Sequence, residues 1–474
     1  EAKEIQALPS VGGEPDLMKS LQFLPGVQSG NEGANNISVR GSNQWGNLVL
    51  LDEAVVYNPS HVLSFFSVFN NDAIREVNLY KSFFPLKYGG RSSSVIDVRM
   101  REGNSKERER SAGLGLIASK VLLEGPLKKK EGSYLLSGRF GYPGVVAGLL
   151  GSNLTSKPQM WFYDVNAKVN RTLDARNRMF FSLYSGGDHT VFNKLVKGYG
   201  MDWGNATATI RWNHILNDKT NVNTSAVFSN YYYKYKSLSD GLRYVWKSNM
   251  QSYQLKSDWE RYQNNLLTLK GGVNLHYFTT MPGEVGKSGK DSNITPSQMP
   301  RKSLWDAALY AEANYKFLPR FLLNAGVRLS VLHAPASAYY AAKTFVMPEP
   351  RAELSFIPNA SHRFSASYTQ AAQSIHMLTT SSVGIPSDMW MPANALLKPS
   401  VMRQLALGYE YNFPDKEYTL SLEAYMRRTS HVVDYRKNAD IFQPDIFQLF
   451  YFFRLPRGRS GTGPDRRVRM VCRT

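Results

Sequence analysis

The chain has 474 residues, which is too long for one ordinary hydrophobic core and indicates two or more domains. Apolar residues make up 42% of the chain and charged residues 20%, a composition that excludes a largely disordered protein. A single cysteine, Cys472, excludes disulfide frameworks and thiolate-rich metal sites.

The formal net charge of +19 raises the question of nucleic-acid binding. Residues 454–474 hold seven Arg and one Asp, a net charge of +6, and the remaining +13 is scattered over the rest of the chain. The only other tight basic run is Lys128-Lys129-Lys130, in an expected turn, where it is either solvated or in contact with anionic lipid headgroups. The sequence therefore predicts no nucleic-acid partner.

The first 103 residues combine short helical and extended patterns. A helix is predicted within residues 14–27, where leucines recur at helical spacing before Pro25. The elements predicted after it are a hairpin at 37–56, a second short helix at 62–69, and strands at 72–80 and 95–99. Gly41, Gly89 and Gly90 are expected at turns, because glycine tolerates positive φ. Residues 1–103 are thus predicted to form a small α+β domain.

After a polar linker at residues 104–110, the chain becomes a succession of segments in which apolar and polar residues alternate. In one of them Trp161 and Val165 fall on one face, and Asp164 and Lys168 fall on the other. A strand with one apolar and one polar face suits an antiparallel transmembrane β-barrel, because lipid meets only every second residue.

The predicted connections between these strands alternate in length. Short turns are expected near 171–177, 215–219, 263–265, 318–320, 357–362 and 413–417, and long loops near 143–158, 186–201, 236–250, 279–302, 332–347 and 372–400. Short turns on one side and long loops on the other are typical of outer-membrane barrels.

Seven phrases in the first hundred residues carry a family resemblance. They are Leu8-Pro9, the run from Asp16 to Val27, Val39-Arg40-Gly41, Leu51-Asp52, Asn58-Pro59-Ser60-His61, Ile74-Arg75-Glu76-Val77 and Tyr88-Gly89-Gly90-Arg91. In this order and spacing they resemble the plug domain of the TonB-dependent outer-membrane receptors, particularly the Bacteroidetes forms. Looser phrases, such as Glu124-Gly125-Pro126-Leu127, extend the resemblance to about residue 442. It implies a plug at 1–103 followed by a transmembrane β-barrel at 111–442.

The resemblance also implies a function. Receptors of this kind take up a scarce ligand, such as a siderophore, cobalamin, an oligosaccharide or a peptide, with energy from the inner membrane. The implied partners are the inner-membrane protein TonB with its complex, outer-membrane lipid and a surface lipoprotein, and the implied location is the outer membrane of a Gram-negative cell. The alternative is a non-transporting surface receptor or adhesin.

On the same resemblance, Arg40, Asp52 and Arg91 are expected to make contacts between the plug and the barrel wall. Charges enclosed in a lumen need partners, and a breakable pair suits a part that must move. The alternative is that Arg40 and Asp52 hold only the hairpin of the plug itself.

Aromatic residues near the expected external loops allow two interpretations. Tyr231-Tyr232-Tyr233 and Trp390 either stack on sugars or belong to an aromatic belt at the membrane boundary, and we favour the belt.

The sequence contains no recognisable catalytic or metal-binding motif. Gly286-Lys287-Ser288 imitates the end of a phosphate-binding loop, but Met281 stands where that motif needs glycine. Asp188-His189 is not expected to act as a dyad, because neighbouring residues of a strand face opposite sides. The sequence therefore predicts neither an enzyme nor a cofactor.

The last part of the chain departs from the family. About fourteen strands are expected between Ser111 and Ser430, whereas the family barrel has 22. Beyond Phe442 the alternation stops, and residues 443–474 read as an aberrant basic tail, which we interpret as a frameshift or truncation; an arginine-rich RNA-binding arm is the alternative. An open fourteen-stranded sheet would leave two edges unpaired in lipid, so the uptake function is expected of an intact parent. The mature start of that parent, with its energy-coupling box, is expected upstream of Glu1.

Overall fold

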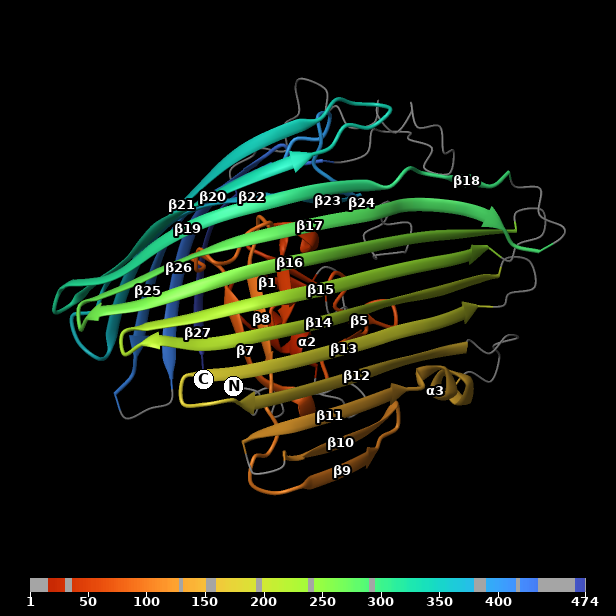
Figure 1. The fold of residues 1–474 in the computed structure, drawn as a ribbon, viewed down its shortest axis with the longest axis horizontal. Helices are drawn as coiled ribbons and strands as arrows, with labels where there is room; N and C mark the ends of the chain where they lie inside the picture. The colour runs from red at the N-terminus through yellow and green to blue at the C-terminus, as the bar shows by residue number, and fades with distance from the viewer. Residues whose placement is uncertain are drawn as a thin grey trace.

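The computed structural model describes residues 16–29, 36–127, 131–150, 159–192, 198–237, 243–289, 295–378, 389–414, 418–433 and 465–473. A small N-terminal unit is enclosed by a large antiparallel sheet that curves around it (Figure 1). We call the enclosed unit, residues 16–100, the plug, and the surrounding sheet the wall. The predicted fold class, a small α+β plug followed by an antiparallel β-barrel, is confirmed.

The plug is organised around a four-stranded sheet with the order β4-β3-β8-β7, in which β3 and β8 are parallel. Its elements are α2 (Leu17–Gln22), β1 (Val27–Ser29), β2 (Ile37–Val39), η1 (Gln44–Gly46), β3 (Leu48–Leu51), β4 (Ala54–Val55), β5 (Ser60–His61), β6 (Phe66–Ser67), η2 (Asn71–Ala73), β7 (Ile74–Tyr80) and β8 (Val95–Met100). Helix α2 begins after Asp16, whose carboxylate accepts a hydrogen bond from the backbone N–H of Lys19. Leu17, Ile37 and Ile96 are fully buried in the apolar core of the plug.

The second helix predicted in the plug, at residues 62–69, does not form. Val62, Leu63 and Ser64 have φ angles of 49°, 53° and 77°, which a right-handed helix cannot accommodate. The apolar spacing that suggested a helix instead buries Val62 and Phe66 on either side of a tight turn between β5 and β6.

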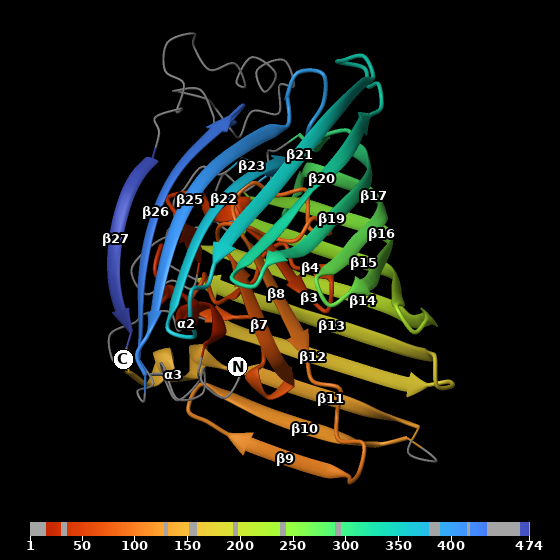
Figure 2. The same ribbon diagram turned by 90° about the vertical axis from the view of Figure 1, so that its left-hand side faces the viewer.

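The wall follows the chain order, and each strand pairs with the next. Its strands are β9 (Glu109–Leu114), β10 (Ala118–Pro126), β11 (Gly132–Gly141), β12 (Gln159–Thr172), β13 (Asn177–Phe192), β14 (Tyr199–Asn217), β15 (Thr220–Ser237), β16 (Tyr244–Asn264), β17 (Leu267–Lys287), β18 (Ser297–Gln298), β19 (Lys302–Leu318), β20 (Phe321–Ala334), β21 (Lys343–Phe356), β22 (His362–Gln373), β25 (Ser400–Asn412), β26 (Thr419–Ser430) and β27 (Asp465–Arg473). Helix α3 (Pro143–Leu150) lies between β11 and β12. Figure 2 shows these strands curving around the plug.

The alternation of short turns and long loops is confirmed. The strands β14 and β15, for example, are separated only by residues 218 and 219, and β19 and β20 by residues 319 and 320. On the opposite side the strands run further than predicted: β17 continues to Lys287, inside the loop expected from residue 279. With 21 residues, β16 and β17 are about twice as long as the roughly 9–11 residues that a strand needs to cross a bilayer.

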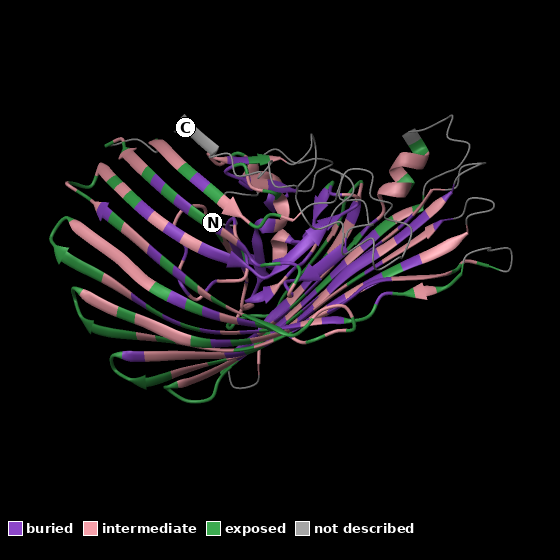
Figure 3. Cartoon of the chain, turned by 90° about the horizontal axis from the view of Figure 1, so that it is seen from above, coloured by how far each residue is buried: buried purple, intermediate pink, exposed green. Residues whose placement is uncertain are grey.

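The two faces of the wall differ as the alternation predicts. In β12, Asp164 and Lys168 face the plug and are buried, whereas Trp161 and Val165 are exposed on the outside. Figure 3 shows the same striping of buried and exposed residues along many strands. The inner face is therefore polar and the outer face apolar.

The end of the chain differs from the prediction. Residues 465–473, within the tail expected to lie outside the barrel, form β27, which pairs with β26 along its length. The described residues hold seventeen strands in this sheet, including the two-residue β18, and its strand order closes into a barrel through β9. The expected strand count is close: fifteen long strands of the wall and the short β18 lie between Glu109 and Ser430, where about fourteen were expected. The expectation of an open sheet was wrong, because β27 adds a further strand after β26 and the strand order closes.

A hairpin from the segment after β22 folds back onto the plug. It consists of β23 (Ile375–Leu378) and β24 (Met389–Pro392), and all eight residues of the two strands are buried. Trp390 of this hairpin packs against Trp45 and Tyr57 of the plug. The hairpin therefore covers one end of the plug inside the wall.

Candidate functional site at the interface between plug and wall

Arg40 connects the plug to β26. Its Nη2 donates to Oε2 of Glu423 over 2.8 Å, and its guanidinium carbon lies 4.8 Å from the ring centre of Tyr425. Lys81 donates to the other carboxylate oxygen of Glu423 over 2.7 Å. Arg40 has a φ of 53° and Gly41 a φ of 72°, so the chain turns sharply where the arginine side chain leaves it.

Asp52 joins the plug to β12 and β13. Its Oδ2 lies 2.8 Å from Nζ of Lys168 and accepts a hydrogen bond of 2.7 Å from the hydroxyl of Ser182. Its Oδ1 accepts from the backbone N–H of Met100 in the plug itself over 3.0 Å. One carboxylate therefore holds a plug turn and two wall strands at once.

Glu53, the residue after Asp52, forms ion pairs with two cations of the wall. Its carboxylate lies 2.9 Å from Nζ of Lys256 and 3.3 Å from Nη1 of Arg211. Burial opposes the charge of Glu53, but Lys256 and Arg211 outweigh it and hold the pKa of this carboxyl well below its usual range. Glu53 is therefore ionised and fixed between β14 and β16.

His61 is enclosed by two wall carboxylates. Its Nε2 lies 2.7 Å from Oδ1 of Asp164, and Arg139 donates to the other oxygen of Asp164 over 2.6 Å. Its Nδ1 lies 2.6 Å from Oδ2 of Asp188, whose Oδ1 accepts the backbone N–H of Val62. Burial works against protonation of His61, but the two carboxylates raise its pKa from 6.5 to about 9.

Two wall arginines hold the segment before Gly89. Arg351 donates from Nη1 to the carbonyl oxygens of Phe84 and Tyr88 over 3.2 and 2.9 Å, and Arg328 donates to that of Leu86 over 3.2 Å. A Cβ atom on Gly89 would lie 2.5 Å from Nε of Arg328. Position 89 requires glycine because the wall approaches it closely. Position 90 favours glycine for another reason, because its backbone adopts a φ of 80°.

Arg91 differs from the other two predicted residues. It is 7% exposed, and no carboxylate of a described residue lies within ion-pair distance of it. Its Nη1 donates to the carbonyl oxygen of Gly90 over 3.2 Å, and its guanidinium carbon lies 5.2 Å from the ring of Trp390 and 6.0 Å from that of Tyr57. Arg91 therefore meets the β23–β24 hairpin and no strand of the wall through these contacts.

Aromatic side chains line a small cavity at the same end of the plug. It is enclosed by Trp45, Tyr57, Trp203, Tyr231, Tyr233 and Trp390, among others. Tyr231 and Tyr233 face inward, whereas Tyr232 between them is more exposed. The aromatic-belt interpretation is therefore wrong for Tyr231, Tyr233 and Trp390.

Catalytic or metal chemistry finds little support among the described residues. Asp188 faces the plug, while His189 faces away and pairs with Asp202 at 2.5 Å, so the two neighbours do not form a dyad. Within this part of the chain, no group of His, Cys, Asp and Glu is placed to hold a metal ion. No helix in it has both the length and the apolar character needed to cross a membrane.

Sequence reasoning brought together only part of this interface. Arg40 and Asp52 contact the wall, but whether these contacts act as releasable locks stays a prediction. In the sequence His61 stands out only as part of the phrase Asn58-Pro59-Ser60-His61, although a histidine in a plug can pair with a charged strand face such as that of Asp164. Glu423-Ala424-Tyr425 is one of the looser phrases of the family resemblance, but nothing in the sequence indicates Glu423 as the partner of Arg40.

Comparison with protein families adds to this geometry. Residues 148–460 match the model described as TonB dependent receptor-like, beta-barrel, and residues 3–96 match that of the TonB-dependent Receptor Plug Domain. A search of curated proteins found no match.

Solved structures of similar fold share little sequence with the chain. The FrpB iron transporter from Neisseria meningitidis superposes with a TM-score of 0.67 at 12% identity, over 92% of this chain and 72% of that one. The copper transporter OprC gives 0.66 at 13% identity, over 91% and 71%. BauA, the ferric preacinetobactin receptor from Acinetobacter baumannii, gives 0.63 at 12% identity, over 85% of this chain and 66% of its own length. The chain thus spans about two thirds of that receptor.

Proposed function

Because the chain belongs to the TonB-dependent receptor family, we propose that it takes up a scarce ligand across the outer membrane of a Gram-negative cell, with energy supplied through TonB. The ligand is a siderophore, cobalamin, an oligosaccharide or a peptide. Outer-membrane lipid surrounds the wall, and a surface lipoprotein is the proposed partner at the outer rim. The proposed division is a plug at 1–103, a linker at 104–110 and a barrel from 111, and a shifted reading frame at 443–474 stays a prediction.

One observation carries this proposal: the plug is fastened to the wall by charged and polar contacts at several separate strands. Arg40, Asp52, Glu53 and His61 all have wall partners at 2.6–3.3 Å. Such groups can exchange protein partners for water when they separate, so their contacts can be broken and formed again. An apolar interface of the same extent would lose its hydrophobic stabilisation each time it opened.

The proposed ligand entry is the aromatic cavity beneath the β23–β24 hairpin. Trp390, Tyr231 and Tyr233 present flat apolar faces there, which suit a ligand with rings or with apolar sugar faces. The cavity is too small to hold such a ligand, so the hairpin has to move before the ligand can enter.

The test is uptake of a panel of labelled ligands by cells expressing the receptor, with and without a proton-motive force. We expect one ligand to accumulate in the periplasm only in energised cells, and its uptake to be lost in cells without TonB. Surface binding of a ligand without any accumulation would overturn the proposal and indicate a non-transporting receptor.

A further inference from the structure

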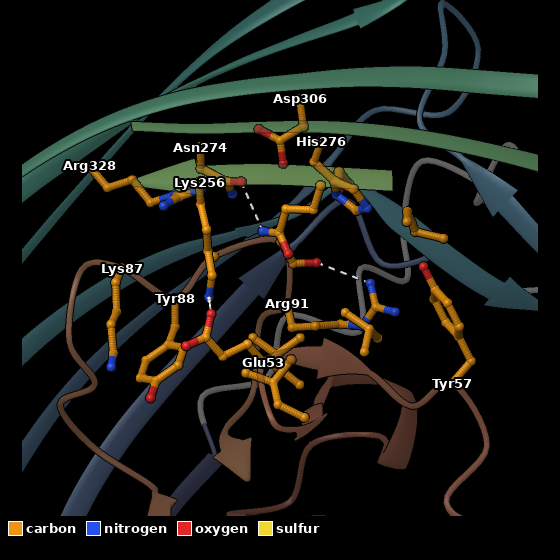
Figure 4. A pocket seen from close by; sticks show the side chains of 18 residues that line it. Glu53, Tyr57, Lys87, Tyr88, Arg91, Lys256, Asn274, His276, Asp306 and Arg328 are labelled. Carbon is orange, nitrogen blue, oxygen red and sulfur yellow. Dashed lines mark hydrogen bonds and ion pairs between the residues drawn. The ribbon is translucent and has the colours of Figure 1, made fainter. Parts of the chain in front are cut away.

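A second cavity lies deeper in the interface, between the plug and the wall strands β16, β17, β19 and β20 (Figure 4). It has a volume of about 50 Å³. In Figure 4, Asp306 and His276 hang from the wall above it, and Arg91 lies on the plug side below. The charged side chains around it are Glu53, Lys87, Arg91, Lys256, Asp306 and Arg328.

Three of these charges have partners among the described residues. Lys256 pairs with Glu53 at 2.9 Å, and Arg328 lies 3.8 Å from Glu349 and donates to the backbone of Leu86. These groups form the fixed frame of the cavity and need no further partner.

Among the described residues, three charges have no ion-pair partner within this frame. Lys87 is only partly buried, and its Nζ lies 4.9 Å from the ring centre of Tyr88. Arg91 and Asp306 are both buried and opposite in sign. Arg91 is more than nine-tenths buried, and among the described residues its only hydrogen-bond acceptor is the carbonyl oxygen of Gly90, next to it in the chain. Asp306 is 6% exposed, and its Oδ1 has no hydrogen-bond partner in the described part of the chain. Both line the same cavity, yet they do not form an ion pair with each other. A buried charge without a partner is costly, which points to a missing ligand.

Arg91 and Asp306 require different groups on a ligand. Arg91 requires an anion, because a guanidinium only donates. An ionised Asp306 only accepts, so it repels a bare anion and attracts one that carries a proton. Hydrogen phosphate meets both demands, whereas sulfate, of nearly the same shape, has no O–H group at neutral pH.

We propose that this cavity binds a hydrogen phosphate group, with Arg91 donating to the anion and Asp306 accepting its O–H. The group is either free phosphate or the phosphate of an imported ligand. The inference rests on the proposed uptake function only in placing the site on the interface that uptake would open.

The test uses the purified full chain in detergent at pH 7, titrated with inorganic phosphate, sulfate and glycerol phosphate by calorimetry. We expect phosphate to bind at least about tenfold more tightly than sulfate, because sulfate leaves Asp306 without a donor. Glycerol phosphate carries an O–H only as its monoanion, so it is also titrated at pH 6. Its binding there would indicate the phosphate of a ligand, and its exclusion at both pH values would indicate free phosphate. Equal binding of phosphate and sulfate, or binding of neither, would overturn the proposal.

Three variants assign the binding to the two residues. Arg91→Gln should weaken phosphate binding at least about tenfold, and Asp306→Asn should abolish the preference for phosphate over sulfate. Arg75→Gln is the matched control, because it removes the same charge from a plug side chain that is 62% exposed. If Arg91→Gln does not fold, Arg91→Lys serves instead and should show a smaller loss.

An unchanged phosphate affinity in a folded Arg91 variant would reject the site. Because the titration needs neither cells nor an energy source, this failure would leave the uptake proposal standing. Conversely, if the cells took up no ligand, phosphate binding measured with the purified protein would still support the site.

Discussion

Nδ1 of His61 in the plug lies 2.6 Å from a carboxylate oxygen of Asp188 in the wall, while Asp164 takes the other ring nitrogen. A histidine between two carboxylates is held in its charged form, and here the positive charge itself fastens the plug.

This charge makes the docking of the plug dependent on pH. The pKa of His61 is raised from 6.5 to about 9, so its contribution is fully present below about pH 6.5 and is lost as the pH rises through 9. The contribution is about 3 kcal/mol. Thermal unfolding of the purified protein between pH 6 and pH 10 should show a falling melting temperature, and His61→Gln should flatten this dependence. A parallel fall in both proteins would refute the role of His61.

The pair between Asp52 and Lys168 is buried, so breaking it should be expensive. Lys168→Met leaves the Asp52 carboxylate enclosed without its cation and is expected to lower the free energy of unfolding by about 3–5 kcal/mol. Lys270→Met, which removes a pair with Glu260 whose two side chains are 34% and 33% exposed, should cost less than about 1 kcal/mol. Denaturant titration gives the free energy of unfolding of both variants. Equal losses would contradict the conclusion that the Asp52–Lys168 pair is buried.

The two glycines before Arg91 should respond differently to substitution. Gly89→Ala places a methyl group against the guanidinium of Arg328 and is expected to cost about 1–3 kcal/mol. Gly90→Ala has room but a positive φ, and should cost about 1 kcal/mol through backbone strain. Gly286→Ala, where nothing lies within 4 Å, is the control and should be neutral. Melting temperatures of the three variants check this order.

Side chains in the aromatic cavity should affect ligand binding in an alternating way. Tyr231→Ala removes an inward ring and is expected to weaken binding of the imported ligand about tenfold, the loss typical of one stacking ring. Tyr232→Ala, one residue on and more exposed, should leave the affinity unchanged. Equal effects of the two variants on the dissociation constant would place the ligand elsewhere.

Much of this architecture could be predicted from local pattern. The alternation around Asp164 and Val165 determined which face of β12 lies inward, because a shift of one residue would place charges in lipid. Turns such as that between β19 and β20 were predictable for the same reason, since they interrupt the alternation at regular intervals.

The interface could not be predicted in this way. Arg40 and Glu423 are 383 positions apart, and nothing near either residue indicates the other. Val62 has an apolar spacing that suits a helix, and only its positive φ shows otherwise. In the tail, Val468, Met470 and Cys472 do alternate with other residues, but the arginine-rich composition concealed this pattern.

The contacts of the plug follow one another along the chain: Arg40 first, then Asp52, then His61, then the segment up to Tyr88. A tension applied at the N-terminal side of the plug would therefore load them one at a time, each bearing the force only after its predecessor had given way. In a single-molecule pulling experiment such a series gives a staircase of small ruptures in place of one large one. The plug can then yield by stages, with the Tyr88 end still anchored while the first part has already come free.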